Sequence, residues 1–155
     1  MRVGLVGCVK RKADHPRPAQ DLYVSDMFRK RRAHVESSCG RWFILSAKYG
    51  LVEPLTVIEP YDLTLNELPA QQRRQWSQRV LVQLERAIGD LTGLDFEIHA
   101  GSPYRNYGVV DGLESLGARV VIPASGLSFG RQLSFYKSAV TSHSGGEYSP
   151  VQRKA

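Results

Sequence analysis

The pattern of apolar and polar positions predicts four strands and four helices in alternation. Short apolar runs rich in β-branched residues are typical of strands buried on both faces of a sheet. They occupy residues 2–8, 42–45, 94–99 and 119–122. Other segments carry apolar side chains three and four positions apart, or begin with a helix-capping residue, which is typical of helices. They occupy residues 25–38, 69–88, 102–116 and 128–140.

Local signals mark the ends of these elements. Ser25, Ser102 and Ser128 can each cap a helix, and Pro103 suits a first helical position. Gly117 is suited to the position after a helix end. Residues 46–52 are expected to leave the second strand as a loop, which Pro54 and Pro60 keep irregular.

Strands that alternate with helices indicate repeated β-α units with helices on both faces of a parallel sheet. We therefore predict an α/β three-layer sandwich around a central, mostly parallel four-stranded sheet. Residues 1–140 are expected to form one catalytic domain and residues 141–155 a flexible basic tail. Ligands bind beyond the carboxyl ends of such strands, which here are residues 7–12, 46–52, 99–105 and 124–130.

Composition narrows the class of protein. With 155 residues, 42% hydrophobic and 23% charged, the chain is typical of a globular domain that buries a core. No stretch is long and apolar enough for a membrane span. Cys8 and Cys39 lack the spacing of a disulfide framework or zinc site, so a cytoplasmic protein without a metal is expected. The patterns G-x-x-x-x-G-K-[ST], G-x-G-x-x-G and H-x-E are absent, and no cofactor is expected.

The net charge of +6 is concentrated in one part of the chain. Between Lys10 and His34 there are eight Lys or Arg residues and three acids. Such a cluster suits binding to a phosphate backbone, although a solvated helix face is an equally good explanation. The candidate backbone contacts are Lys10, Arg11, Arg29, Lys30, Arg31, Arg32 and Arg131.

Lys12 and Cys8 follow the first strand and are candidate nucleophiles. Lys10 and Arg11 would lower the pKa of Lys12 if they lie close to it, and a partly neutral amine can form a Schiff base. The alternative is an exposed lysine that binds phosphate. Cys8 is either a reactive thiol or, more simply, a small buried hydrophobic residue.

The segment after the second strand combines aromatic and charged residues. Tyr49 and Tyr61 could stack on an extruded base, and Lys48 could meet a phosphate. Asp62 is the carboxylate we expect to orient water or stabilise a cationic sugar. The alternative is that Tyr61 packs in the core and Asp62 caps a turn.

His99 lies at the end of the third strand, next to a helix start that can hold an anion. We predict Asp62, His99 and Lys12 as catalytic residues, with His99 stabilising a departing base. A structural role for His99 is the alternative. The predicted substrate-binding residues are Cys8, Tyr23, Ser46, Lys48, Tyr49, Gly50, Tyr61, Ser102, Tyr104, Arg105, Ser125 and Gly126.

Four segments carry a resemblance to a known family. Gly-Cys-Val-Lys-Arg-Lys, Leu-Tyr-Val-Ser-Asp-Met-Phe, Ile-Leu-Ser-Ala-Lys-Tyr-Gly-Leu-Val and Ile-Glu-Pro-Tyr-Asp resemble small bacterial and phage proteins of the DUF6884 type, to about Lys137. More distantly, residues 7–12 are similar to the P-C-S-x-x-K motif in the lyase-type domain of archaeosine synthase, with Gly7 and Val9 in place of Pro and Ser. That resemblance implies that Lys12 corresponds to the lysine that attacks a deazaguanine nitrile.

The predicted architecture resembles the uracil-DNA glycosylase superfamily. His99-Ala-Gly-Ser-Pro is similar to the His-Pro-Ser-Pro motif of those enzymes, which implies a site beside the sugar and the flipped base. Their acidic water-activating motif has no counterpart after the first strand except Asp14, so the resemblance favours a modified base over uracil, as in phage DNA and hence in antiviral defence.

Three hypotheses follow for function. The first is a DNA glycosylase that removes a modified base and leaves an abasic site. The second is a tRNA deazaguanine transferase or lyase that uses Lys12. The third is a nucleic-acid-binding module without chemistry. The expected partner is nucleic acid, DNA rather than RNA, with neither a membrane nor an obligate protein partner.

Overall fold

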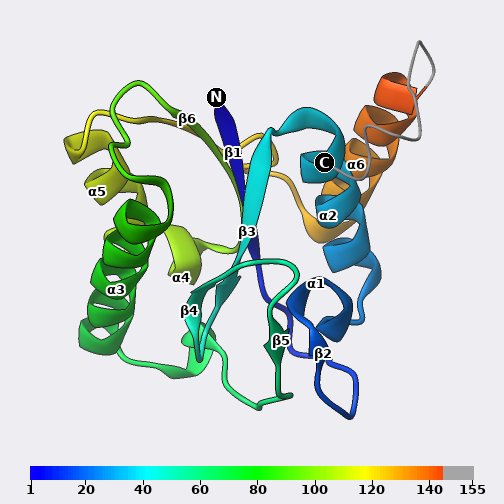
Figure 1. Cartoon of the computed structure of the whole chain (residues 1–155). Coiled ribbons are helices and arrows are strands. Elements are labelled where there is room, and N and C mark those ends of the chain that lie inside the picture. The colour runs from blue at the N-terminus through cyan, green and yellow to red at the C-terminus, as the bar shows by residue number, and fades with distance from the viewer. Residues whose placement is uncertain (145–155) are drawn as a thin grey trace.

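A five-stranded, mostly parallel sheet forms the centre of the molecule (Figure 1). The computed structural model describes residues 1–144, and the side chains of residues 1–138. The strand order is β4-β3-β1-β6-β7, in which only β4 runs antiparallel to its neighbour. The strands are β1 (Arg2–Gly7), β3 (Arg41–Ser46), β4 (Gly50–Val52), β6 (Asp95–His99) and β7 (Arg119–Val121).

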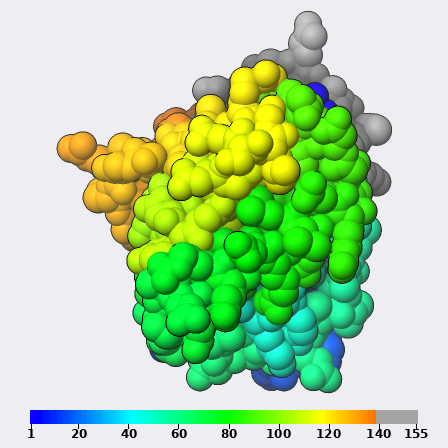
Figure 2. Space-filling model, turned by 90° about the vertical axis from the view of Figure 1, so that its left-hand side faces the viewer, coloured from blue at the N-terminus to red at the C-terminus, as the bar shows by residue number. Residues whose placement is uncertain are grey.

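Helices cover both faces of this sheet. On one face α2 (Asp26–Ser38) packs against β1 and against α6 (Phe129–Ser144). On the other lie α3 (Ala70–Ile88), α4 (Ser102–Arg105) and α5 (Val109–Ser115). Seen from the α3 side, the green surface of α3 meets the yellow surface of α5, and the orange segment leading into α6 projects at one edge (Figure 2).

Two apolar cores, one on each face, hold the layers together. Phe96, Ile98, Trp76 and Val80 belong to the core beneath α3. The core beneath α2 includes Phe28. Side chains two residues apart on a strand point to the same face, so β1 supplies Val3 and Leu5 to the core beneath α3 and Val6 to the core beneath α2.

Short elements cap the carboxyl end of the sheet. Strands β2 (Arg17–Pro18) and β5 (Val57–Ile58) form a two-stranded antiparallel sheet. Helix α1 (Ala19–Leu22) and the 3-10 helix η1 (Leu65–Glu67) complete this end. These elements order the segments between β1 and α2 and between β4 and α3, which both carry predicted site residues.

The structure corrects the predicted sheet in one respect. It has five strands and not four, because residues 50–52 form the edge strand β4 where a loop was expected. Gly50 has φ of 76°, a conformation that glycine adopts without strain, and the chain reverses there to pair with β3. The helix predicted over residues 102–116 is also divided into α4 and α5 by residues 106–108.

Of the tail predicted for residues 141–155, the first four residues continue α6 and the others lie outside the described residues. No described helix combines the length and apolar character that crossing a membrane requires.

The strand order creates a topological switch point between β1 and β6. The chain leaves β1 through α2 towards β3, on one face of the sheet. It leaves β6 through α4 and α5 towards β7, on the other face. Two neighbouring strands whose connections diverge leave a crevice at their carboxyl ends, which is where α/β sheets bind ligands.

Candidate functional site

A cavity of about 520 Å³ lies at this switch point. Its wall is formed by the residues after β1, the start of α2, the segment around η1, the start of α4 and the start of α6. The lining residues are Cys8, Val9, Lys10, Arg11, Ser25, Asp26, Met27, Arg31, Leu63, Thr64, Asn66, Gly101, Pro103, Tyr104, Phe129 and Gln132. A volume of this size accommodates a small organic ligand such as a nucleobase with its sugar.

Positive charge gathers around the cavity. Lys10, Arg11 and Arg31 line it, against the single carboxylate of Asp26. Arg31 donates from Nη2 to Gln132 Oε1 at 3.1 Å, while its buried Nε has no hydrogen-bond partner among the described residues. The amino ends of α2 and α6 also border the cavity, and helix amino ends favour anions. The cavity therefore suits a negatively charged ligand.

Lys12 lies beside the cavity and packs against two aromatic rings. Its Nζ is 4.4 Å from the ring centroid of Tyr61 and 5.8 Å from that of Tyr23, and it donates to Lys10 O at 3.0 Å. Burial lowers the pKa of the Lys12 ammonium below its ordinary value, although the charges of Cys8 and Asp62 oppose this effect. A lysine in this environment is more readily neutral, and hence nucleophilic, than an exposed one.

The rings beneath Lys12 are fixed by a buried hydroxyl network. Ser46 Oγ donates to the hydroxyl of Tyr61 at 2.7 Å, and this hydroxyl also bonds that of Tyr23 at 2.7 Å. The backbone N–H of Tyr49 donates to Ser46 Oγ at 3.0 Å. Burial raises the pKa of Tyr23 and of Tyr61 above the ordinary phenol value, so both stay neutral.

The same network changes how the tyrosines can act. The Tyr61 ring has Lys12 over it and the rings of Tyr23 and Tyr49 packed edge-on. We expected Tyr61 to stack on a base, but in the structure its ring is packed against Lys12 and holds the ammonium in position. Tyr49 is half-buried and remains more open, with Lys48 Nζ 5.3 Å from its ring centroid.

Cys8 lies at the floor of the cavity. Its Sγ is 3.3 Å from the hydroxyl of Tyr104, which also accepts from Leu65 N at 3.4 Å. Burial raises the pKa of the Tyr104 phenol. Cys8 is half-buried and lines the cavity, so a ligand there can meet its sulfur.

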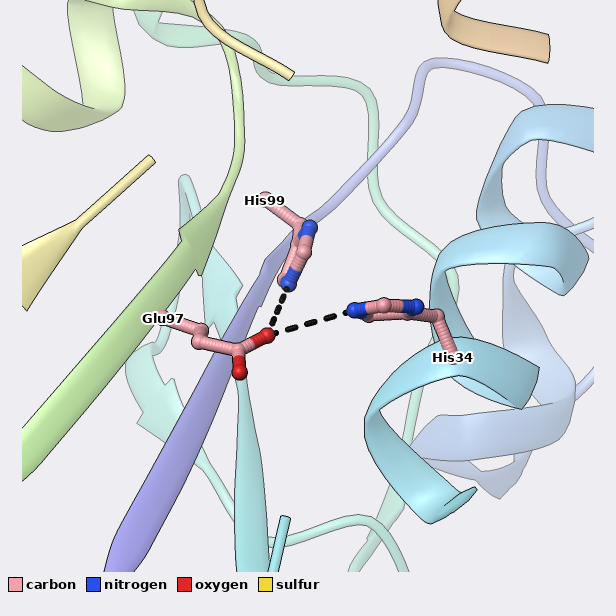
Figure 3. Close-up of side chains that lie close together, drawn as sticks. All are labelled: His34, Glu97 and His99. Atoms are coloured by element: carbon pink, nitrogen blue, oxygen red, sulfur yellow. Dashed lines mark hydrogen bonds and ion pairs between the residues drawn. The ribbon is translucent and has the colours of Figure 1, made fainter. Parts of the chain in front are cut away.

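His99 does not join Lys12, which corrects the predicted catalytic group. Its side chain points into the α2 face of the sheet and is only 1% exposed, within a cluster with His34 and Glu97 (Figure 3). Glu97 Oε1 accepts from His34 Nε2 at 3.2 Å and from His99 Nε2 at 3.1 Å. The hydroxyl of Tyr136 lies 2.7 Å from His99 Nδ1. A residue held this way has no access to a departing base.

The charges in this cluster are set by its surroundings. Burial lowers the pKa of His99, which favours the neutral ring. Burial alone would raise the pKa of Glu97, but the hydrogen bonds from His34 and His99 outweigh it and hold the carboxyl well below its usual range. Glu97 Oε2 also forms an ion pair with Arg2 at 3.1 Å. Glu97 is therefore a carboxylate that lies between the side chains of His34 and His99.

Several other predicted site residues are not among those that line the cavity. Ser102 and Arg105 are on α4, where Arg105 Nε donates to Ala100 O, and Ser125 and Gly126 follow β7 in an exposed turn. Gly50 faces Gln83 of α3. Lys48 is exposed, and Asp62 is exposed but interacts with the charge of Lys12.

The predicted backbone-binding residues lie in different surroundings. Lys10, Arg11 and Arg31 line the cavity described above. Lys30 pairs with Asp26, and Arg32 with Asp21 and Glu36. Arg29 and Arg32 border a second, open cavity of about 560 Å³ together with Arg17, and Arg131 is exposed on α6. The ion pairs already satisfy part of this basic segment, so Lys10, Arg11, Arg29 and Arg131 are the cations most available to a partner.

Sequence reasoning missed residues that only the fold brings together. The segment around η1 and the start of α6 contribute to the cavity wall from distant parts of the chain. His34 and Glu97 join His99 although 63 residues separate His34 from Glu97. One usable signal was the spacing of Glu97 and His99, since residues two apart on a strand share a face.

The fold and cavity together define a class: an α/β domain with a mostly parallel sheet and a basic cavity at its topological switch point. The chain belongs to the family described as "Family of unknown function (DUF6884)", which it matches over residues 3–138. The expected resemblance to this family is thereby confirmed, and the matched range contains all the residues of the site. A search of curated proteins gives no significant match.

Proposed function

We propose that this chain is a DNA glycosylase that removes a modified base, with Lys12 as the nucleophile. One observation carries the proposal: the Lys12 ammonium, whose pKa burial lowers, is fixed over Tyr61 beside a basic cavity at the carboxyl ends of β1 and β6. Attack on a nucleotide sugar requires a nucleophile next to a pocket that binds an anionic ligand, and Lys12 and the cavity meet this requirement.

The reaction begins with neutral Lys12. Its amine attacks C1′ of the deoxyribose, the bond from C1′ to the base breaks towards the base, and the proton lost by the amine passes to the departing base. Asp62, whose charge already acts on Lys12, stabilises positive charge on the sugar. The sugar ring then opens to a Schiff base, with the second amine proton moving to O4′. Water hydrolyses the Schiff base, restores Lys12 and leaves an abasic site.

The cavity supplies recognition. Lys10, Arg11 and Arg31 provide charge for the phosphates that flank the target nucleotide. Leu63, Pro103 and Tyr104 provide apolar surface for an extruded base. Phosphate contacts of this kind act on any sequence, so the choice of base falls to the polar groups of Asp26, Asn66 and Gln132 on the wall.

Trapping the intermediate tests the proposal. The protein is incubated with duplex and single-stranded DNA carrying a panel of modified bases, with sodium borohydride present, and covalent complexes are resolved by electrophoresis. We expect a complex with wild-type protein, because reduction of a Schiff base by borohydride joins the protein to the DNA permanently. Abasic sites are expected when borohydride is omitted. Wild-type protein that yields neither a complex nor abasic sites on any DNA would refute the proposal.

Two variants locate the nucleophile. Lys12→Arg keeps the positive charge but cannot form a Schiff base, so it should bind DNA and give no complex. Lys137→Ala removes an exposed lysine on α6 and serves as the matched control, with trapping unchanged. A complex that persists in Lys12→Arg would assign the chemistry elsewhere. A complex with tRNA but with no DNA would favour the deazaguanine-modifying hypothesis.

A further inference from the structure

We propose that His34, Glu97 and His99 bind a divalent transition metal ion of the Zn²⁺ class. Two imidazoles and one carboxylate are a ligand set that zinc and non-haem iron use in proteins. The three residues come from α2 and β6, and their ligand atoms lie within 4.8 Å of one another. This cluster is separate from Lys12 and its cavity, so the inference does not depend on the proposed glycosylase.

The geometry of the three ligand atoms carries the inference. Both imidazoles direct Nε2 at the same carboxylate oxygen, Glu97 Oε1, as Figure 3 shows. The two N···O distances are 3.2 and 3.1 Å. Metal–ligand bonds of about 2.0 Å give a tetrahedron with an edge of roughly 3.3 Å. The two distances to Glu97 Oε1 therefore already match those around a bound ion, and the third, between the two histidine nitrogens, is within 4.8 Å.

The surroundings hold two of the three ligands, Glu97 and His99, in place. Arg2 Nη1 pairs with Glu97 Oε2 at 3.1 Å, which leaves Oε1 as the oxygen for the ion. The Tyr136 hydroxyl, 2.7 Å from His99 Nδ1, can accept a hydrogen bond from the Nδ1–H group when Nε2 binds metal. Metal-binding histidines characteristically have such a partner on the second ring nitrogen.

A network without metal is the competing explanation. In that case both imidazoles carry a proton on Nε2 and donate to Glu97, and the cluster serves only to satisfy buried polar groups. In such a network Oε1 of Glu97 accepts two hydrogen bonds, while Oε2 forms the ion pair with Arg2. The two explanations differ in what happens when metal is supplied. With metal, three protein ligands leave a fourth tetrahedral position for water or another small ligand.

Metal titration of the full-length protein tests the proposal. Protein is unfolded in the presence of a chelator to remove metal and, after the chelator is removed, is refolded with Zn²⁺ or, separately, with Co²⁺. Competition with a chromophoric chelator then measures the Zn²⁺ affinity. Refolding is used because buried ligands exchange metal slowly. We expect about one tightly bound ion per chain, an absorption spectrum typical of tetrahedral or five-coordinate Co²⁺, and a rise in melting temperature with metal concentration.

Variants identify the ligands. His34→Ala and Glu97→Gln should each lose the bound ion and the Co²⁺ spectrum. Tyr136→Phe, a positioning change, should keep the ion but weaken its affinity about 10–100-fold. His15→Ala is the matched control, because His15 is an exposed histidine beside a carboxylate, that of Asp14. It should bind metal as the wild type does.

Either of two results would overturn the proposal. One is wild-type protein that binds no stoichiometric ion after refolding with metal. The other is binding that survives in His34→Ala and disappears in His15→Ala, which would place the ion at the surface. Should Glu97→Gln fail to fold, the wild-type Co²⁺ spectrum and the affinity of Tyr136→Phe still decide the question.

Discussion

Removing one hydroxyl from the network beneath Lys12 should destabilise the fold measurably. In Tyr61→Phe the ring that supports Lys12 remains, but its oxygen, which bonds Tyr23 and Ser46 at 2.7 Å each, is lost. Tyr23 is 2% exposed and Ser46 fully buried, so water has poor access to either hydroxyl. A buried polar group left without a partner costs about 1–3 kcal/mol.

The size of the effect follows from the partners that remain. Ser46 Oγ keeps the bond that it accepts from Tyr49 N, whereas the bond between Tyr23 and residue 61 is lost. We therefore expect a loss of about 2–3 kcal/mol in the free energy of unfolding, or a fall of roughly 5–10 °C in melting temperature for a chain of this length.

Urea denaturation followed by circular dichroism measures this loss. Tyr107→Phe is the matched control, because the Tyr107 hydroxyl accepts from Arg73 Nη1 at 3.1 Å but Tyr107 is only half-buried. Water can replace that bond, so the control should lose less than about 1 kcal/mol. Equal losses in the two variants would show that the network does not stabilise the fold, and would remove the reason for assigning Tyr61 a fixed position under Lys12.

Three further predictions concern single residues. Burial lowers the pKa of Lys12, and only the neutral amine reacts with an acylating reagent. The acylation rate of Lys12, followed by mass spectrometry as the pH is raised, should therefore reach half its maximum at a pH below the ordinary lysine pKa of about 10.4. A rate that reaches half its maximum at that pKa would contradict the structure. Gly4→Ala would place a Cβ 2.7 Å from Val35 Cγ1 and should cost about 1–3 kcal/mol, partly recovered in the double variant with Val35→Ala; costs that simply add would argue against this contact. Burial beside Glu97 raises the pKa of the Cys39 thiol to about 11. In the variant Cys8→Ser, which leaves Cys39 as the cysteine that can react, alkylation at pH 8 should be roughly 10²-fold slower than that of a free cysteine. Only unfolding in urea should restore the rate.

Local patterns were sufficient to predict most of the fold. The four predicted strands and the long helices correspond to β1, β3, β6, β7, α2, α3 and α6, because apolar periodicity and capping residues act within a few positions. Strand β4 escaped notice because three residues are too short to display a period. It exists because Gly50 turns the chain back onto β3, and pairing with a neighbour is not a local property.

The candidate site was predictable in part for the same reason. The position of Lys12 after β1 follows from where the strand ends, and its neighbours Tyr23 and Tyr61 come from segments whose course depends on the small sheet of β2 and β5. The sequence places His99 correctly at the end of β6, but its side chain points to the buried cluster on the α2 face and not to Lys12. Alternation along the strand sends Phe96 and Ile98 to the α3 face and Glu97 and His99 to the α2 face.

Helix α2 connects the cavity with the buried cluster, although the two are separate. Arg31 lines the cavity, and its guanidinium lies 6.0 Å from the ring centroid of Tyr136. Tyr136 in turn bonds His99, and His34 lies one turn beyond Arg31 on α2. An anion that draws Arg31 towards the cavity therefore acts on the residue that positions His99. Coupling between two binding sites is reciprocal, so an ion bound at Glu97 should alter anion binding at Arg31 by the same factor. Tyr136→Phe, which removes only the hydroxyl in this path, should abolish that mutual effect and leave both ligands able to bind.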